Sequence, residues 1–107
     1  MYARMLHLKS KAGKSTNLRK TILEQALPTL KKQPGFVDAI VLTSETENGY
    51  LLGISFWDSK QDADRFGEGP GRQIRDLMRP LLEADPMLQG FDVAGSTLRH
   101  IAGERAA

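Results

Sequence analysis

Short apolar runs, partly alternating with polar residues, predict three β-strands in the first half of the chain. The first covers residues 2–9, and the second, rich in Val, Ile and Leu, covers residues 36–44. The third covers residues 50–57 and follows an Asn-Gly dipeptide, which is a strong hairpin turn signal. Because the third strand directly follows this turn, it is expected to pair with the second.

Apolar residues recur at helical spacing in the segment between the first two strands, which predicts a helix over residues 15–32. Its apolar stripe consists of Leu18, Ile22, Ala26 and Leu30. Pro28 lies inside this pattern and should kink the helix or shift its last turn, since proline lacks an N–H and crowds the preceding turn. Pro34-Gly35 should end the element.

A second helical region begins after Ser59, whose side chain can cap the exposed amides, with Asp62 completing a capping-box-like pattern. Glycines and a proline in residues 67–71 should interrupt it. The second piece carries apolar residues at spacings expected for a buried stripe: Ile74, Leu77, Met78, Leu81 and Leu82. A last strand is expected within residues 88–99.

The predicted order is βαββαβ, which indicates a ferredoxin-like antiparallel sheet with helices on one face. Residues 1–100 then form a single domain, and residues 101–107 form a loose tail. The second and third strands are apolar on both faces, which a chain of 107 residues cannot cover with its own helices. A second copy is the economical cover, so we expect a homodimer, a dimeric α+β barrel.

Alternation divides the side chains of the third strand between the two faces of the sheet. Tyr50, Leu52, Ile54 and Phe56 share one face, and Leu51, Gly53, Ser55 and Trp57 share the other. Gly53 and Ser55 are small and leave room beside Trp57. This room suits either a pocket or a closely packed helix, and the sequence leaves both open.

Charge is unevenly distributed along a chain whose composition is ordinary for a globular protein. Residues 1–35 carry eight Lys and Arg against one acid, and residues 36–64 carry six acids against one Lys. We interpret the basic segment as a solvated helix face, or as a surface that pairs with the acidic middle of the chain, rather than as a nucleic-acid surface. The chain has no apolar run long enough to span a bilayer and no signal-peptide pattern, so we expect a cytoplasmic protein without a membrane partner.

Several motif-based functions are excluded by the sequence. Gly13-Lys14-Ser15-Thr16 ends like a phosphate-binding loop, but Leu8 stands where that motif needs its first glycine. The third strand lacks the aromatic pattern of an RNA-recognition domain, so no nucleic-acid partner is expected. There is no cysteine, and the two histidines are His7, on the first strand, and His100, after the last. We expect those two strands not to be neighbours, so no metal site is predicted.

Pro34-Gly35-Phe36, the apolar strand after it, Phe56-Trp57-Asp58-Ser59 and the acidic helix up to Phe66 resemble the antibiotic biosynthesis monooxygenase family. The resemblance implies a homodimer with a pocket between sheet and helices in each subunit. Some members oxygenate phenols or anthrones without metal or flavin, so no cofactor is expected. Another branch degrades haem with an Asn on the first strand and a His on the second helix. This chain has neither.

From this resemblance we predict a cofactor-independent monooxygenase for a small aromatic or quinol substrate. His7 is the candidate base, since other quinol-type members use a His near the pocket. Trp57 and Tyr50 are candidates for lining or flanking the pocket, although at most one is expected inside. Arg72 and Arg75 are candidates for holding a phenolate or carboxylate. The alternative is a non-catalytic homodimer that binds a small hydrophobic ligand or serves as a scaffold.

Overall fold

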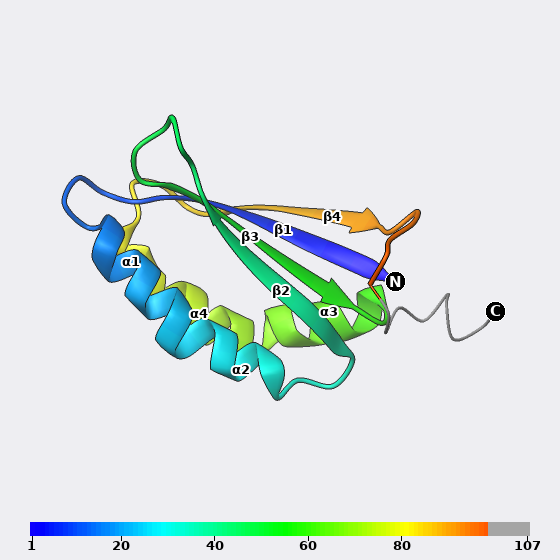
Figure 1. Cartoon of the computed structure of the whole chain (residues 1–107). Coiled ribbons are helices and arrows are strands. Elements are labelled where there is room, and N and C mark those ends of the chain that lie inside the picture. The colour runs from blue at the N-terminus through cyan, green and yellow to red at the C-terminus, as the bar shows by residue number, and fades with distance from the viewer. Residues whose placement is uncertain (99–107) are drawn as a thin grey trace.

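A computed structural model describes residues 1–98, which form a curved four-stranded antiparallel sheet covered by helices on one face (Figure 1). The strands are β1 (Tyr2–Lys9), β2 (Phe36–Thr43), β3 (Tyr50–Trp57) and β4 (Met87–Asp92). They lie in the order β2-β3-β1-β4, which is the ferredoxin-like arrangement expected from the sequence. The expectation that the first and last strands are not neighbours was wrong, because β1 and β4 form an antiparallel pair in this order. The expected tail, residues 101–107, and His100 lie outside the described residues.

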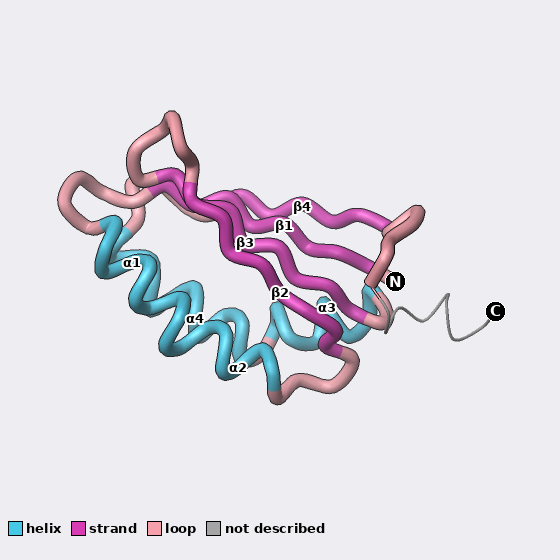
Figure 2. Tube along the Cα trace, viewed as in Figure 1, coloured by secondary structure: helices cyan, strands magenta, loops and turns pink. Residues whose placement is uncertain are grey.

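The helices all lie on one side of the sheet, as Figure 2 shows for the described part of the chain. They are α1 (Ser15–Thr21), α2 (Leu27–Lys31), α3 (Lys60–Glu68) and α4 (Pro70–Met78). A π-helical turn, Ile22–Ala26, joins α1 to α2, and a 3₁₀ turn, Arg79–Leu81, follows α4. None of the helices described is both long and apolar enough to cross a membrane.

Pro28 changes the hydrogen bonding of the first helical segment without ending it. The Leu27 N–H donates to the carbonyl of Ile22, five residues earlier, and Pro28 then sits in the first turn of α2. A wider turn suits proline, because it lacks an N–H and its ring would crowd the carbonyl four residues before it. The apolar stripe stays continuous: Leu18, Ile22 and Ala26 are all buried.

Ser59 and Gly69 set the limits of α3. The Ser59 hydroxyl accepts a 3.2 Å hydrogen bond from the Asp62 N–H, as the capping pattern predicts. Gly69 interrupts the helical backbone, and Pro70 begins α4. The expectation for Leu77 was wrong: this side chain is 56% exposed, because Ile74 and Met78 face the sheet and no described element covers the flank of Leu77.

Strand register assigns each side chain of the sheet to one of two faces. Tyr2 pairs with Trp57, and Leu8 pairs with Leu51, on the face that the helices cover. These four side chains are buried. The opposite face, here called the open face, has no covering element among residues 1–98. It carries Met5, His7, Ile40, Leu42, Tyr50, Leu52, Ile54, Phe56, Met87, Gln89 and Phe91.

Candidate functional site

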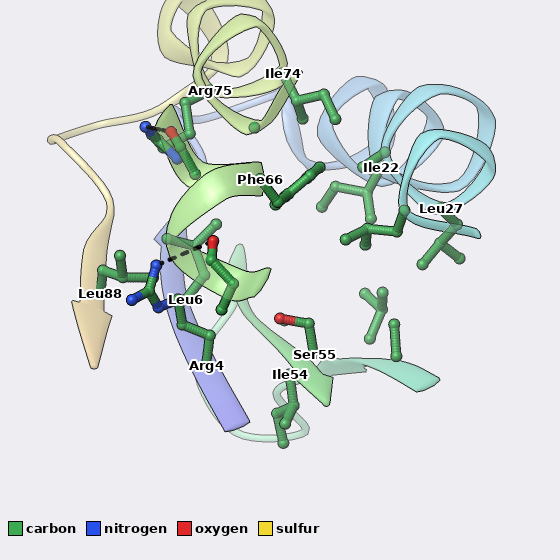
Figure 3. Close-up of a pocket in the computed structure, with 18 of the residues that line it drawn as sticks. Arg4, Leu6, Ile22, Leu27, Ile54, Ser55, Phe66, Ile74, Arg75 and Leu88 are labelled. Atoms are coloured by element: carbon green, nitrogen blue, oxygen red, sulfur yellow. Dashed lines mark hydrogen bonds between the residues drawn. The ribbon is translucent and has the colours of Figure 1, made fainter. Parts of the chain in front are cut away.

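A cavity of about 110 Å³, partly open to solvent, lies between the sheet and the helices. Figure 3 shows side chains from both layers surrounding it. Its walls are mostly apolar, with Leu6 and Val41 on the sheet side and Ile22, Phe66 and Ile74 on the helix side. An apolar cavity with a few polar groups is the usual form of a small-molecule site.

Gly53 opens the floor of this cavity at the middle of β3. It lies beside Leu6 of β1 and Val41 of β2, on the face that the helices cover. A Cβ atom built on Gly53 would meet no other atom within 4 Å. The room that the sequence left unassigned is therefore a cavity rather than the contact surface of a closely packed helix.

Trp57 forms one end of the cavity wall and is only 1% exposed. Its ring packs edge-on against Phe36, with centroids 5.7 Å apart. It also packs in a tilted orientation against Phe66 of α3, with centroids 5.3 Å apart. Its indole N–H donates a 2.9 Å hydrogen bond to the Ser55 hydroxyl. Trp57 thus both lines the cavity and packs against the second helical region.

Arg75 brings a positive charge to the apolar lining. Its guanidinium donates a 2.8 Å hydrogen bond to the carbonyl of Gly67, drawn as a dashed line in Figure 3. No carboxylate within residues 1–98 forms an ion pair with it. A charge held in an apolar wall without a carboxylate partner favours an anionic or strongly polarised ligand group nearby.

Arg4, which sequence reasoning did not single out, also lines the cavity. It forms an ion pair with Asp64 and lies over the Tyr2 ring, 5.4 Å from its centroid. Burial lowers the pKa of Arg4, but hydrogen bonds to Tyr2 and Asp64 raise it more, so the guanidinium stays charged. Because Asp64 balances this charge, Arg75 is the stronger candidate for an anion partner.

His7 and Tyr50 lie on the open face, and the sheet separates them from the cavity. The His7 Nδ1 and the Tyr50 hydroxyl are hydrogen-bonded, and His7 Nε2 lies 2.8 Å from the Gln89 amide oxygen. Arg72 is exposed on α4 and does not line the cavity. The structure therefore brings Trp57 and Arg75 together at one cavity and leaves the other three candidates outside it.

Alternation along β1 could have identified Arg4 beforehand. Tyr2, Arg4, Leu6 and Leu8 share one face of the strand, and three of these four side chains have the apolar or aromatic character of a covered face. A charged residue in such a row is a candidate for function.

Metal ligands do not cluster in the part of the chain that the structure describes. It has no group of three His, Cys, Asp or Glu side chains that could hold an ion.

A family model and several solved structures agree on the family to which this chain is similar. A family model described as antibiotic biosynthesis monooxygenase matches residues 1–74. SnoaB, a cofactor-independent oxygenase from Streptomyces nogalater, superposes with a TM-score of 0.77 at 16% identity, over 90% of this chain and 95% of that one. No significant match was found among curated protein sequences.

Two further solved structures have the same fold. The monooxygenase from the gene ActVA-Orf6 of Streptomyces coelicolor, in complex with nanaomycin D, gives a TM-score of 0.75 at 18% identity, covering 91% of this chain and 90% of that one. A Nitrosomonas europaea protein of unknown function gives 0.79 at 16% identity, covering 91% and 92%. At these identities the structural likeness establishes the fold alone.

Proposed function

The chain belongs to the antibiotic biosynthesis monooxygenase family, and from that premise we propose that it is a cofactor-independent monooxygenase for a small aromatic or quinol substrate. The observation that carries the proposal is the apolar cavity with Arg75 among its lining residues. An oxygenase from Streptomyces nogalater described as cofactor-independent has the same fold, which supports the reaction class.

The size of the cavity supports a small substrate. An engineered apolar cavity of about 150 Å³ binds benzene, and the cavity here has about 110 Å³ and is partly open. It would enclose about one ring and let the remainder of a larger molecule extend through the opening. Apolar walls exclude water, which strengthens the electrostatic effect of Arg75 on an ionised substrate.

In the proposed reaction the substrate itself supplies electrons to oxygen once it has lost a proton. For an anthrone-type ring, the activated CH₂ carbon loses a proton to water at the cavity opening, and its electron pair reduces O₂. The peroxide anion that forms at this carbon takes up a proton. Cleavage of the O–O bond with loss of the remaining C–H proton then releases water and leaves a carbonyl group. Arg75 would stabilise the ring oxygen as negative charge develops on it, and Trp57 would hold the ring plane.

A homodimer that binds a hydrophobic ligand without turnover is the alternative. It is favoured by one observation: no His, Asp, Glu or Tyr lines the cavity, so the described lining holds no general base. His7 remains our candidate base for a ligand held on the open face, between the sheets of two subunits. The two locations for the reaction are separable by experiment.

Oxygen consumption with dithranol and with substituted hydroquinones tests the proposal. We expect Arg75→Met to reduce kcat about a hundredfold, the usual effect of removing one donor from an oxyanion site. Arg72→Met is the matched control, since Arg72 lies on the same helix and outside the cavity. If His7→Ala loses oxygen consumption and Arg75→Met keeps it, the reaction takes place on the open face and not in the cavity. Tight binding without oxygen consumption across the panel would establish the non-catalytic alternative.

A further inference from the structure

Ser55 lies in the cavity floor, between Gly53 and Trp57 on the covered face of β3. In Figure 3 its hydroxyl oxygen points into the space between the sheet and Phe66. The same oxygen lies 2.9 Å from the indole nitrogen of Trp57. The side chain therefore contacts the Trp57 wall and the cavity at once.

The chemistry of the two side chains fixes the direction of this hydrogen bond. An indole N–H can only donate, whereas a serine hydroxyl can accept and also donate its own proton. Ser55 is therefore the acceptor from Trp57. Within residues 1–98 no acceptor for the Ser55 proton is found, since its bond with Trp57 is the only one that this hydroxyl makes. The proton remains available to a molecule in the cavity.

We propose that the Ser55 hydroxyl, oriented by Trp57, donates a hydrogen bond to a carbonyl or phenolate oxygen of the bound molecule. This inference rests on the proposed use of the cavity for an aromatic substrate. A hydroxyl that already accepts one hydrogen bond becomes a stronger donor, because bonds in a chain polarise one another. Trp57 thus positions Ser55, and Ser55 contacts the ligand.

The rest of the lining favours an acceptor group on the ligand. Arg4 and Arg75 offer only N–H donors, and no carboxylate lines the cavity. Apolar side chains surround these groups, so a ligand oxygen would be paired away from water. The ligand class is therefore an apolar ring that bears a keto or ionised phenolic oxygen, and a hydrocarbon of equal shape should gain nothing from Ser55.

A matched ligand pair separates hydrogen bonding from packing. Acetophenone and isopropylbenzene have the same number of non-hydrogen atoms, and only the ketone can accept a hydrogen bond. Trp57 is the one tryptophan of the chain, so ¹⁵N-labelled protein gives a single indole N–H signal beside Ser55. Titration of this signal measures the Kd of each ligand for wild type and for Ser55→Ala.

We expect Ser55→Ala to weaken acetophenone binding about 5- to 10-fold, the effect of one lost hydrogen bond, and to leave isopropylbenzene binding unchanged. Ser55→Cys keeps the size with a weak donor and should behave in the same way, while Ser55→Thr should retain the ketone preference. Ser44→Ala, the same change in the β2–β3 loop outside the cavity, should alter neither affinity.

If Ser55→Ala weakens the binding of both ligands equally, Ser55 has only a packing role and the inference is overturned. An unchanged affinity of Ser55→Ala for acetophenone would also overturn it. Either result would leave the proposed function standing, because the wild type would still bind aromatic molecules in the cavity. If the wild type binds neither ligand, the cavity is not an aromatic site, and both proposals fail.

Discussion

His7 and Tyr50 are hydrogen-bonded to each other on the open face, with their ring centroids 6.0 Å apart. Gln89 of β4 contacts the other ring nitrogen of His7. Because β1 and β3 stand between this group and the cavity, the two sheet faces have different chemistry. One bears Trp57 and faces Arg75 of α4 across the cavity, and the other presents a small polar cluster among apolar side chains.

The open face is expected to bind a second copy of the chain. Ile40, Leu42, Met87 and Phe91 are each 43–57% exposed on it, and burying such side chains releases about 25 cal/mol per Å² of apolar surface. We predict that Leu42→Lys makes a folded monomer, because an unpaired charge in an apolar interface is costly. Analytical ultracentrifugation of the wild type and the variant measures this.

Leu77→Lys is the control for the interface prediction. Leu77 is 56% exposed, against 46% for Leu42, but it lies on α4, at the helix side of the subunit. It should leave the dimer intact. A monomeric wild-type chain at micromolar concentration would refute the expected dimer, and a dimer lost only in Leu77→Lys would place the interface on the helices.

Gly53→Val should close the cavity without harming the fold. The new side chain would project into free space, and valine suits a strand, where glycine is destabilising by about 0.5–1 kcal/mol. We expect stability to urea to be equal or higher and acetophenone affinity to fall more than tenfold. Gly95→Ala is the control. A Cβ atom at Gly95 also meets no atom within 4 Å, but Gly95 lies outside the cavity, so this variant should bind acetophenone as tightly as the wild type does.

Gly90→Ala should have the opposite effect on stability. A Cβ atom at this position of β4 would lie 1.8 Å from the Tyr2 hydroxyl oxygen, and Tyr2 is buried. Overpacking of this kind costs about 1–3 kcal/mol. Urea denaturation of Gly90→Ala, Tyr2→Phe and the double variant tests the contact. The double variant should be more stable than the sum of the single effects predicts, and strict additivity would argue against the clash.

The ion pairs of Asp64 should make stability depend on acidic pH. Hydrogen bonds from Lys60 and from Arg4 hold the pKa of Asp64 below its ordinary value of 3.8. The group therefore stabilises the fold above about pH 4, and this contribution disappears as pH falls through the lower folded-state pKa. Urea denaturation measures the free energy of unfolding of the wild type and of Asp64→Asn. The wild type should be the more stable at pH 7, and the two values should converge near pH 2.

Asp76→Asn is the comparison for this pH effect. Asp76 and Arg79 are both exposed, and their closest N and O atoms are 3.8 Å apart, so the pair should contribute little at any pH. A wild-type advantage over Asp64→Asn that persists unchanged at pH 2 would contradict the assigned cause, since a protonated Asp64 cannot keep its charge pairs.

Residue periodicity predicted the elements because it is a local property of the chain. Strands 2–9 and 50–57 have the predicted bounds, and Ser59 caps α3 as expected. The two-sided apolar character of β2 and β3 was equally readable. Leu77 was misassigned, since helical spacing indicates which residues share a stripe but not how far a neighbouring element covers that stripe.

The sequence by itself determined the order of the elements, the division of each strand into two faces and the likeness to one family, because alternation and turn residues act over a few positions. Only the tertiary structure decided which face holds the cavity. Pairing of β1 with β3 separates His7 from Trp57, and packing of α4 brings Arg75, and not Arg72, to the cavity wall. These relationships join residues far apart in the chain, so no local pattern contains them.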